Sequence, residues 1–349
     1  MRSIIPIFLL ASGALAASPA VFTPQERSAL LEDQTLAVCY SGFRHGQHPD
    51  RGQGPKNPSR EEILEDLKIL SQQAGFRLLR VYDSKENSRR VLEIIREERL
   101  PLKVLLGAWL GPEVSTHGSC AWVGEPMPEK MLAENRVAND EEVDRAIALA
   151  REFPDVVIAV NIGNETLVDW NDHRVSVERL KEMLGRAGEA LDQPVTTADN
   201  YAAWARYGPE LAEVVDFAGV HTYPIWEKQT LAGAMAFTID NLSAVQRALP
   251  GVPIAITEAG WATTASEFPE QAGEDQQEVH LRELSAWART NNVTVFWFEA
   301  FDEDWKGDPA DPLGAEKHWG LYDIDRKPKK AARECLPVGT VQPKSAEDS

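Results

Sequence analysis

The chain has 349 residues and a formal net charge of −19, and 43% of its residues are hydrophobic. A surface with this excess of acidic groups repels nucleic acid and anionic membranes, so we exclude both as partners. The charge suits a neutral or cationic ligand, and the hydrophobic content is ample for a packed core. The length fits either two average domains or one large α/β barrel.

The first residues, MRSIIPIFLLASGALAAS, combine an early positive charge, an apolar stretch and small residues near Ala16. This pattern predicts a secretory signal peptide over residues 1–17, with a retained N-terminal anchor helix as the alternative. We therefore expect a soluble mature protein, secreted or periplasmic, with one catalytic domain over residues 18–337. The polar residues 338–349 predict a disordered tail.

The three cysteines, Cys39, Cys120 and Cys335, cannot all pair with one another. Cys39 lies in an apolar run and is expected in the core. Export would permit a disulfide between Cys120 and Cys335. The chain is nevertheless no disulfide scaffold.

After Thr35, short apolar runs alternate with amphipathic stretches. The apolar runs, rich in Val, Ile and aromatic residues, predict eight strands, at 36–42, 77–82, 102–109, 156–165, 194–199, 217–224, 253–261 and 294–301. Helical patterns lie between them, near 59–70, 84–99, 140–153, 175–191, 210–215, 230–249 and 273–290. The stretch 111–136 lacks a strong periodicity and predicts a long, functional loop.

Continuous apolar strands that alternate with helices predict a parallel sheet, and eight such units predict a single-domain (β/α)₈ TIM barrel of the α/β class. A doubly wound open sheet is the alternative. It would more often carry a Gly-rich phosphate turn after the first strand, where this chain has the long, Pro-rich segment SGFRHGQHPDRGQGPKNPS.

Carboxylates, amides and aromatic side chains end the predicted strands, where the active site of such a barrel is built. These residues are Tyr40, Tyr82, Asp83, Trp109, Asn164, Glu165, Asp199, Asn200, His221, Tyr223, Glu258, Trp261, Glu299 and Asp302. Neutral sugar hydroxyls need such hydrogen-bond partners, and sugar rings stack on Trp and Tyr. Several tryptophans fall in or near the same loops, and we expect three or four to contact ligand: Trp109, Trp170, Trp204, Trp226, Trp261, Trp305 and Trp319.

Two of these acids, Glu165 after the fourth strand and Glu258 after the seventh, face one another across the mouth of an eight-stranded barrel. Paired carboxylates suit glycoside hydrolysis, in which one attacks the anomeric carbon and the other protonates the leaving oxygen and then activates water. The two carboxyl groups lie roughly 5–5.5 Å apart in retaining enzymes and about 6.5–9.5 Å apart in inverting ones.

The motifs VNIGNE, ITEAGWAT and FWFEAFDEDWK resemble those of glycoside hydrolase family 17, the β-1,3-glucanases and glucanosyltransferases, along most of the chain. The resemblance implies Glu165 as general acid/base, Asn164 as a partner of the sugar 2-hydroxyl, and Glu258 as nucleophile. It also implies that Glu299, Asp302 and Lys306 shape the charge of the site. Ala259 and Ala262 depart from the usual Thr and Pro, and the HGQHPDRGQGP loop looks more like bacterial members than plant ones.

The remaining substrate-binding candidates are Tyr40, Arg80, Tyr82, His221, Tyr223, Trp261 and Trp305. Arg80 would orient the nucleophile or simply pair with an acid, and Glu299 is either a substrate contact or an ion-pair partner. His221 is better explained as a hydrogen-bonding residue than as a metal ligand, since no metal-binding spacing of histidines is present. We expect no metal and no organic cofactor.

These features predict a monomeric, exported, retaining enzyme that cleaves β-1,3-glucan of the laminarin type. A β-1,3-glucanosyltransferase that uses the same two glutamates is the first alternative, and a non-catalytic glucan-binding barrel is the second. A metal-dependent barrel hydrolase is a third. We expect a partly closed cleft, shaped by the loops at 41–58 and 111–136, and short products.

Overall fold

Eight parallel strands close into a barrel in the computed structural model, which describes residues 21–336. The strands are β1 Leu36–Cys39, β2 Leu78–Arg80, β3 Lys103–Ala108, β4 Val157–Asn164, β5 Val195–Asn200, β6 Ala218–His221, β7 Ile254–Ala259 and β8 Val295–Trp297. Each strand pairs with its neighbours in chain order, and β8 pairs with β1. The predicted (β/α)₈ barrel is confirmed. The predicted signal peptide and tail lie outside the described residues.

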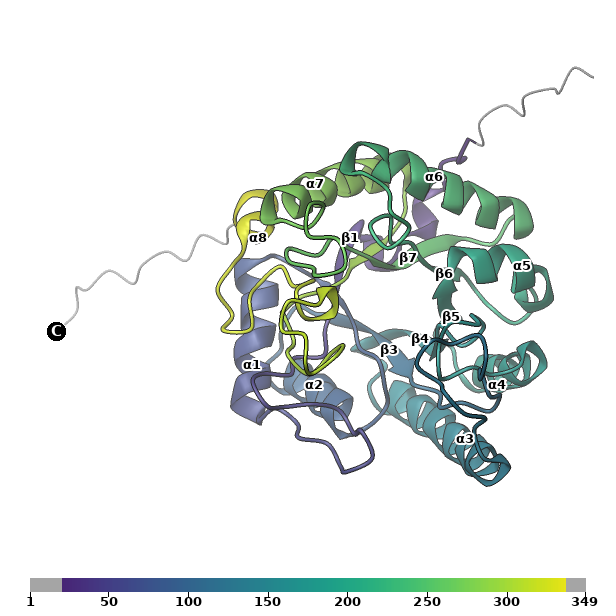
Figure 1. Ribbon diagram of the computed structural model, residues 1–349. Helices are drawn as coiled ribbons and strands as arrows, with labels where there is room; N and C mark the ends of the chain where they lie inside the picture. Colours follow the sequence, from purple (N-terminus) through teal and green to yellow (C-terminus); the bar gives the residue numbers. More distant parts are fainter. Residues whose placement is uncertain (1–20, 337–349) are drawn as a thin grey trace, which may run out of the picture.

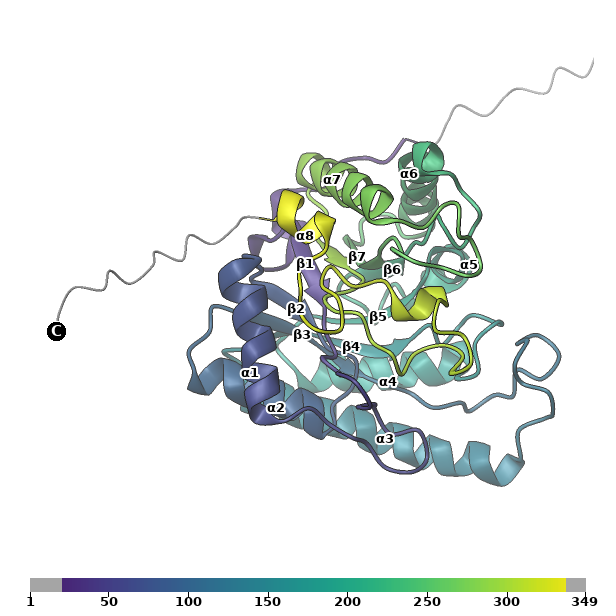
Figure 2. The same ribbon diagram turned by 60° about the vertical axis from the view of Figure 1, so that its left-hand side comes forward.

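Helices surround the barrel, as Figures 1 and 2 show. They are α1 Arg60–Lys68, α2 Glu86–Glu97, α3 Glu129–Glu152, α4 Val177–Ala190, α5 Tyr201–Leu211, α6 Leu231–Ala248, α7 Glu274–Asn291 and α8 Lys330–Cys335. The capping box predicted for the first of them is present, because the Ser59 side chain accepts the Glu62 N–H and Glu62 reaches back to the Ser59 N–H. No helix in residues 21–336 is both long enough and apolar enough to cross a membrane.

Two helix boundaries differ from the sequence prediction. Helix α5 runs over Tyr201–Leu211 rather than 210–215, and Gly208 and Pro209 within it obscure its helical pattern. Asn200 starts this helix, since its side-chain oxygen accepts the Ala202 N–H at 2.8 Å. Helix α3 begins at Glu129, so the last part of the predicted loop at 111–136 is helical.

The core lies inside the barrel and between the barrel and its helices, where the strand side chains are buried almost without exception. The three cysteines are free thiols: Cys39 and Cys120 are buried and Cys335 is half-buried. The Cys120–Cys335 bridge that the sequence allowed is therefore absent. The thiol of Cys335 contacts the backbone oxygen of Glu278 at 3.6 Å instead.

Candidate active site

The carboxyl ends of β4 and β7 bring Glu165 and Glu258 together around one histidine. His221, the last residue of β6, is fully buried and places Nδ1 3.0 Å from Glu165 Oε1 and 3.5 Å from Glu258 Oε2. Those two distances limit the separation of the two oxygens to about 6.5 Å. The two glutamates therefore share one site, as the order of the strands predicted.

Three donors hold the carboxylate of Glu258. Arg80 Nη1 donates to Oε1 at 2.6 Å, the Tyr82 hydroxyl donates to the same oxygen at 3.0 Å, and the Tyr223 hydroxyl donates to Oε2 at 2.7 Å. Burial acts to raise the pKa of Glu258, but His221, Arg80 and the Tyr223 hydroxyl outweigh it and hold that pKa below its ordinary value. The side chain thus stays ionised, as an attacking carboxylate must.

Arg80 joins the ends of three strands from beneath the site. Its guanidinium is fully buried, and besides Glu258 it donates from Nη1 to the backbone oxygen of Thr257 at 3.0 Å and from Nη2 to Asn164 Oδ1 at 2.5 Å. Asn164 is the last residue of β4 and precedes Glu165. The same cation therefore fixes the amide beside one glutamate and the carboxylate of the other.

Glu165 lies in a more open environment than Glu258. Its side chain is 21% exposed, against 7% for Glu258, and its second oxygen accepts a hydrogen bond from Asn171 Nδ2 at 3.2 Å. A carboxyl that reaches solvent can exchange its proton with water between reaction steps. The two acids thus differ in the way that an acid/base and a nucleophile differ.

A second charged group follows β8. Lys306 Nζ lies 2.5 Å from Glu299 Oε2 and 3.2 Å from Glu303 Oε2. Half-buried Glu316 joins them: burial and the charges of Glu165 and Glu258 raise its pKa to about 7, against the opposing effect of Lys306. These three carboxyl groups and the Lys306 ammonium therefore shape the electrostatic field of the site.

Tyr40 and Trp261 do not reach the two glutamates. The hydroxyl of Tyr40 points to Asp66 on α1, at 3.3 Å. Trp261 is fully buried, donates to the Gln271 backbone oxygen at 2.9 Å and packs against His280. We therefore leave both out of the substrate site, in contrast to the sequence-based prediction.

Asp302 also makes structural contacts. Its Oδ1 accepts the Gly320 N–H at 2.9 Å and pairs with Lys329 at 2.7 Å. Trp305 is half-buried, donates from Nε1 to Glu303 Oε2 at 2.8 Å and packs its ring against Phe43. Asp302 thus supports the loop after β8, while Trp305 remains a candidate for sugar contact.

The tryptophans divide into packed and exposed groups. Trp204, Trp261, Trp297 and Trp319 are buried, whereas Trp109, Trp122, Trp170 and Trp226 are 38%, 63%, 46% and 39% exposed. The first of these exposed rings packs against His173 with centroids 4.8 Å apart. The exposed rings offer faces on which sugars can stack.

Sequence reasoning gave no role to Asn171 or Glu316. Both lie well beyond the ends of the preceding strands, β4 and β8, so no strand-end argument could single them out. The nearest signal was the acidic and amide content of the loops after β4 and β8.

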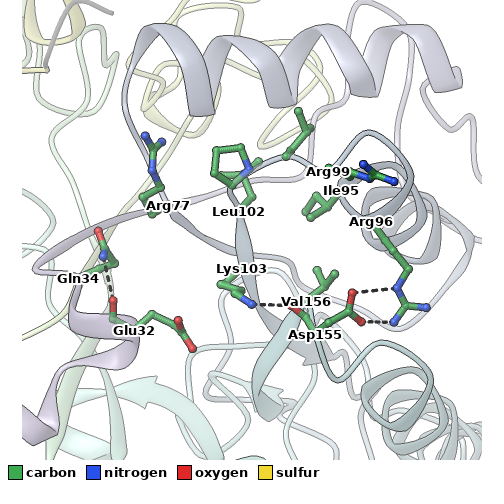
Figure 3. Close-up of a pocket in the computed structure, with 12 residues that line it drawn as sticks. Glu32, Gln34, Arg77, Ile95, Arg96, Arg99, Leu102, Lys103, Asp155 and Val156 are labelled. Carbon is green, nitrogen blue, oxygen red and sulfur yellow. Dashed lines mark hydrogen bonds and ion pairs between the residues drawn. The ribbon is translucent and has the colours of Figure 1, made fainter.

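A cavity of about 540 Å³ lies far from this chemistry, at the amino ends of the strands (Figure 3). Its lining includes Arg77, which precedes β2, and Lys103, the first residue of β3. Asp155 accepts from the neighbouring Arg96 and through its backbone from Lys103. Neither catalytic candidate lines this cavity, so it is not the active site.

Comparison with known proteins gives the family. A model of the BtgE/BtgC glycoside hydrolase domain matches residues 37–320. The chain belongs to this family. The predicted resemblance to glycoside hydrolases is confirmed, and both glutamates fall within the matched residues 37–320.

Curated relatives of this glycoside hydrolase domain include fungal proteins. The chain is 32% identical over 184 residues to a glucan 1,3-beta-glucosidase of Schizosaccharomyces pombe, covering 49% of this chain and 56% of the relative. It is 24% identical over 340 residues to a putative glucan endo-1,3-beta-glucosidase of Aspergillus niger, covering 88% of this chain and 45% of the relative. The chain thus spans about half the length of these relatives. The likeness to bacterial members stays a prediction.

Solved structures share the fold. An endo-laminarinase from Formosa Hel1_33_131 superposes with a TM-score of 0.73 at 26% identity, covering 90% of this chain and 91% of that one. A family 17 β-1,3-glucanosyltransferase from Rhizomucor miehei superposes with a TM-score of 0.66 at 18% identity, covering 88% and 97%. The second likeness shows the barrel alone.

Proposed function

We propose that this glycoside hydrolase domain cleaves β-1,3-glucosidic bonds in glucans with retention of configuration. The observation that carries the proposal is the difference between the two carboxyl groups at His221. Glu258 is buried and kept ionised by Arg80, Tyr82 and Tyr223, whereas Glu165 is more exposed. The limit of about 6.5 Å on their facing oxygens is compatible with the short separation of retaining enzymes.

In the first step of the proposed reaction, a Glu258 oxygen forms a bond to the anomeric carbon while the glycosidic bond breaks. Glu165 gives its proton to the departing oxygen, and a glycosyl-enzyme results. In the second step Glu165 removes a proton from water, the water oxygen bonds to the anomeric carbon, and Glu258 leaves. Asn164, fixed by Arg80, is the proposed partner of the sugar 2-hydroxyl.

A neutral β-1,3-glucan is the proposed substrate. The relatives from Schizosaccharomyces pombe and Formosa are a glucan 1,3-beta-glucosidase and an endo-laminarinase. A neutral polymer is not repelled by a chain with a net charge of −19. The exposed faces of Trp109, Trp170 and Trp226 supply stacking surfaces for its rings.

Transfer to a second sugar is the competing outcome, because a sugar hydroxyl can replace water in the second step. The Rhizomucor miehei structure with this fold is a glucanosyltransferase. Exposed tryptophans favour an acceptor sugar as much as a substrate chain. The choice between water and sugar therefore decides between hydrolase and transferase, and a barrel without turnover would be a glucan-binding protein.

The test is a product profile. Purified protein is incubated with a ladder of laminari-oligosaccharides, and products are followed by mass, with the anomeric configuration read early by NMR. Shorter chains released as the β-anomer support the proposal, and their pattern separates exo from endo action. Longer chains establish a transferase, an α-anomer refutes retention, and activity on another β-glucan alone refutes the β-1,3 assignment.

The control is Glu258→Ala. We expect it to lose turnover while its circular dichroism and melting temperature stay close to those of the parent. An active Glu258→Ala enzyme would refute the assignment of the nucleophile.

We also propose that the protein is exported as a monomer after removal of residues 1–17. N-terminal sequencing of the mature protein tests the cleavage, fractionation separates periplasm from medium, and sedimentation gives the mass. A protein recovered with its N-terminus intact would support the alternative of a retained anchor.

A further inference from the structure

A buried carboxyl beside the site plays no part in the reaction set out above. Asp199 lies near the end of β5, and its side chain is completely buried. Its Oδ2 accepts the Leu167 N–H and its Oδ1 accepts the Asn200 N–H, each at 2.8 Å. Leu167 is the second residue after Glu165, so this carboxyl is bonded to the turn that carries the proposed acid/base.

The turn at Glu165 has an unusual backbone. Glu165 has φ of 49°, in the left-handed region that residues other than glycine seldom adopt. Such a conformation costs free energy and persists only where the surroundings hold it. Its own N–H donates to the Ala198 oxygen at 2.8 Å, and the Leu167 N–H donates to Asp199. Two consecutive residues of β5, Ala198 and Asp199, therefore accept the backbone N–H groups on either side of this turn.

Burying a carboxyl at this position costs free energy, and the two bonds that it accepts require two acceptor oxygens. Burial and the nearby charge of Glu165 raise the pKa of Asp199 to about 8, against the backbone N–H groups that donate to it. Both of its oxygens act as acceptors. An amide has one acceptor oxygen and would turn its NH₂ group toward a backbone N–H. An asparagine of equal volume would thus lose one of the two bonds.

We propose that Asp199 is a positioning residue for Glu165, which fixes the acid/base in line with the glycosidic oxygen by holding the backbone turn behind it. This inference rests on the proposed function, because it assigns Asp199 a purpose only if Glu165 transfers a proton. The expected consequence of its loss is a misplaced acid with an intact nucleophile. A displacement of about 1 Å in a catalytic group lowers the rate by up to about a hundredfold.

The experiment compares two substrates whose leaving groups differ in their need for acid. The leaving group of a laminari-oligosaccharide is a basic sugar oxygen, which needs the proton of Glu165. The leaving group of a 2,4-dinitrophenyl β-laminaribioside is 2,4-dinitrophenolate, which departs without protonation. For Asp199→Asn we expect kcat on the oligosaccharide to fall roughly ten- to a hundredfold with KM little changed. The first-turnover burst of dinitrophenolate should stay close to that of the parent, and Asp199→Ala should lose more on the oligosaccharide than Asp199→Asn.

The matched control is Asp216→Asn. Asp216 Oδ2 accepts the N–H of Val195, the first residue of β5, at 2.7 Å, so it makes the same kind of bond at the opposite end of the same strand. We expect its kinetics to match those of the parent on both substrates. Melting temperatures are measured for every variant, and the assays are run well below the lowest of them.

Two results would overturn the inference. An equal loss on both substrates would mean that Asp199 supports the whole site or the fold, and unchanged kinetics would mean that it does not position Glu165. If Asp199→Ala does not fold, the equal-volume Asp199→Asn carries the comparison. A parent protein without activity on either substrate would instead refute the proposed function, and the inference would fall with it.

Discussion

Replacing Arg80 with Met removes the guanidinium beneath Glu258 and keeps an unbranched side chain at the end of β2. In the parent the pKa of Glu258 is held below its ordinary value, although burial alone would raise it. Without the cation, burial has less to oppose it and the pKa of Glu258 rises. The acidic limb of the kcat/KM profile, which reports the ionisation of the proposed nucleophile in the free enzyme, therefore moves to higher pH.

The structure gives the size of the effect. Arg80 makes a charge-assisted bond to the carboxylate at 2.6 Å with both side chains buried. Hydrogen bonds to charged groups contribute about 1.5–3 kcal/mol, which corresponds to a loss of roughly ten- to a hundredfold in kcat/KM. Breaking a buried ion pair also costs stability, about 3–5 kcal/mol. In the parent the lowered pKa contributes stability at neutral pH that is lost as the pH falls through the folded-state value.

The assay is kcat/KM on laminari-oligosaccharide from pH 3 to pH 9, with melting temperatures over the same range. Arg77→Met is the matched control, because Arg77 lies just before the same strand at the opposite end of the barrel (Figure 3). Tyr82→Phe removes a bond of 3.0 Å to the same oxygen but no charge, so its acidic limb should move less. A folded Arg80→Met enzyme whose acidic limb coincides with that of the parent would refute the electrostatic reasoning.

Three other variants or conditions test the structure. Glu165→Ala should cut turnover of laminari-oligosaccharide by at least roughly a hundredfold, and azide should restore dinitrophenyl substrate turnover with a β-glycosyl azide as product; an α-azide would contradict retention. Asp66→Asn breaks a buried pair with Arg326, at 2.8 Å, and should lower the unfolding free energy by about 3–5 kcal/mol with little change in KM; an unchanged melting temperature would contradict this. Dithiothreitol should leave the melting temperature unchanged because the cysteines are free thiols, and a clear decrease would reveal a disulfide.

The sequence predicts the barrel well because its signals are local. Each strand is a short apolar run, and an acid that ends such a run must lie at the mouth of the barrel. That rule places Glu165 and Glu258 at the mouth together with other strand-end acids, and the family resemblance then distinguishes these two. The same rule fails for Trp261, since a residue three positions beyond Glu258 has already turned into the packing layer beside His280.

The rest of the site depends on contacts between distant segments. Asp199 appears in the sequence as one more strand-end acid, and nothing local says that its oxygens bond the Leu167 and Asn200 N–H groups. Glu316 follows β8 by many residues and approaches the two glutamates only because its loop folds back over the barrel mouth. The register of the strands, the path of the loops and the positive φ angle of Glu165 are properties of the folded chain.

The pairing of β1 with β8 has a consequence for how the protein is made. The loop after β1 is tied to the loop after β8, since Ser41 and the Phe43 N–H both donate to Glu303, at 2.7 and 3.0 Å. A nascent chain that has emerged from the ribosome only as far as β7 already contains both glutamates, but its first strand still lacks a partner on one side. A premature stop before β8 would therefore leave an edge of β1 exposed and open to pairing with other chains, in place of a shorter enzyme.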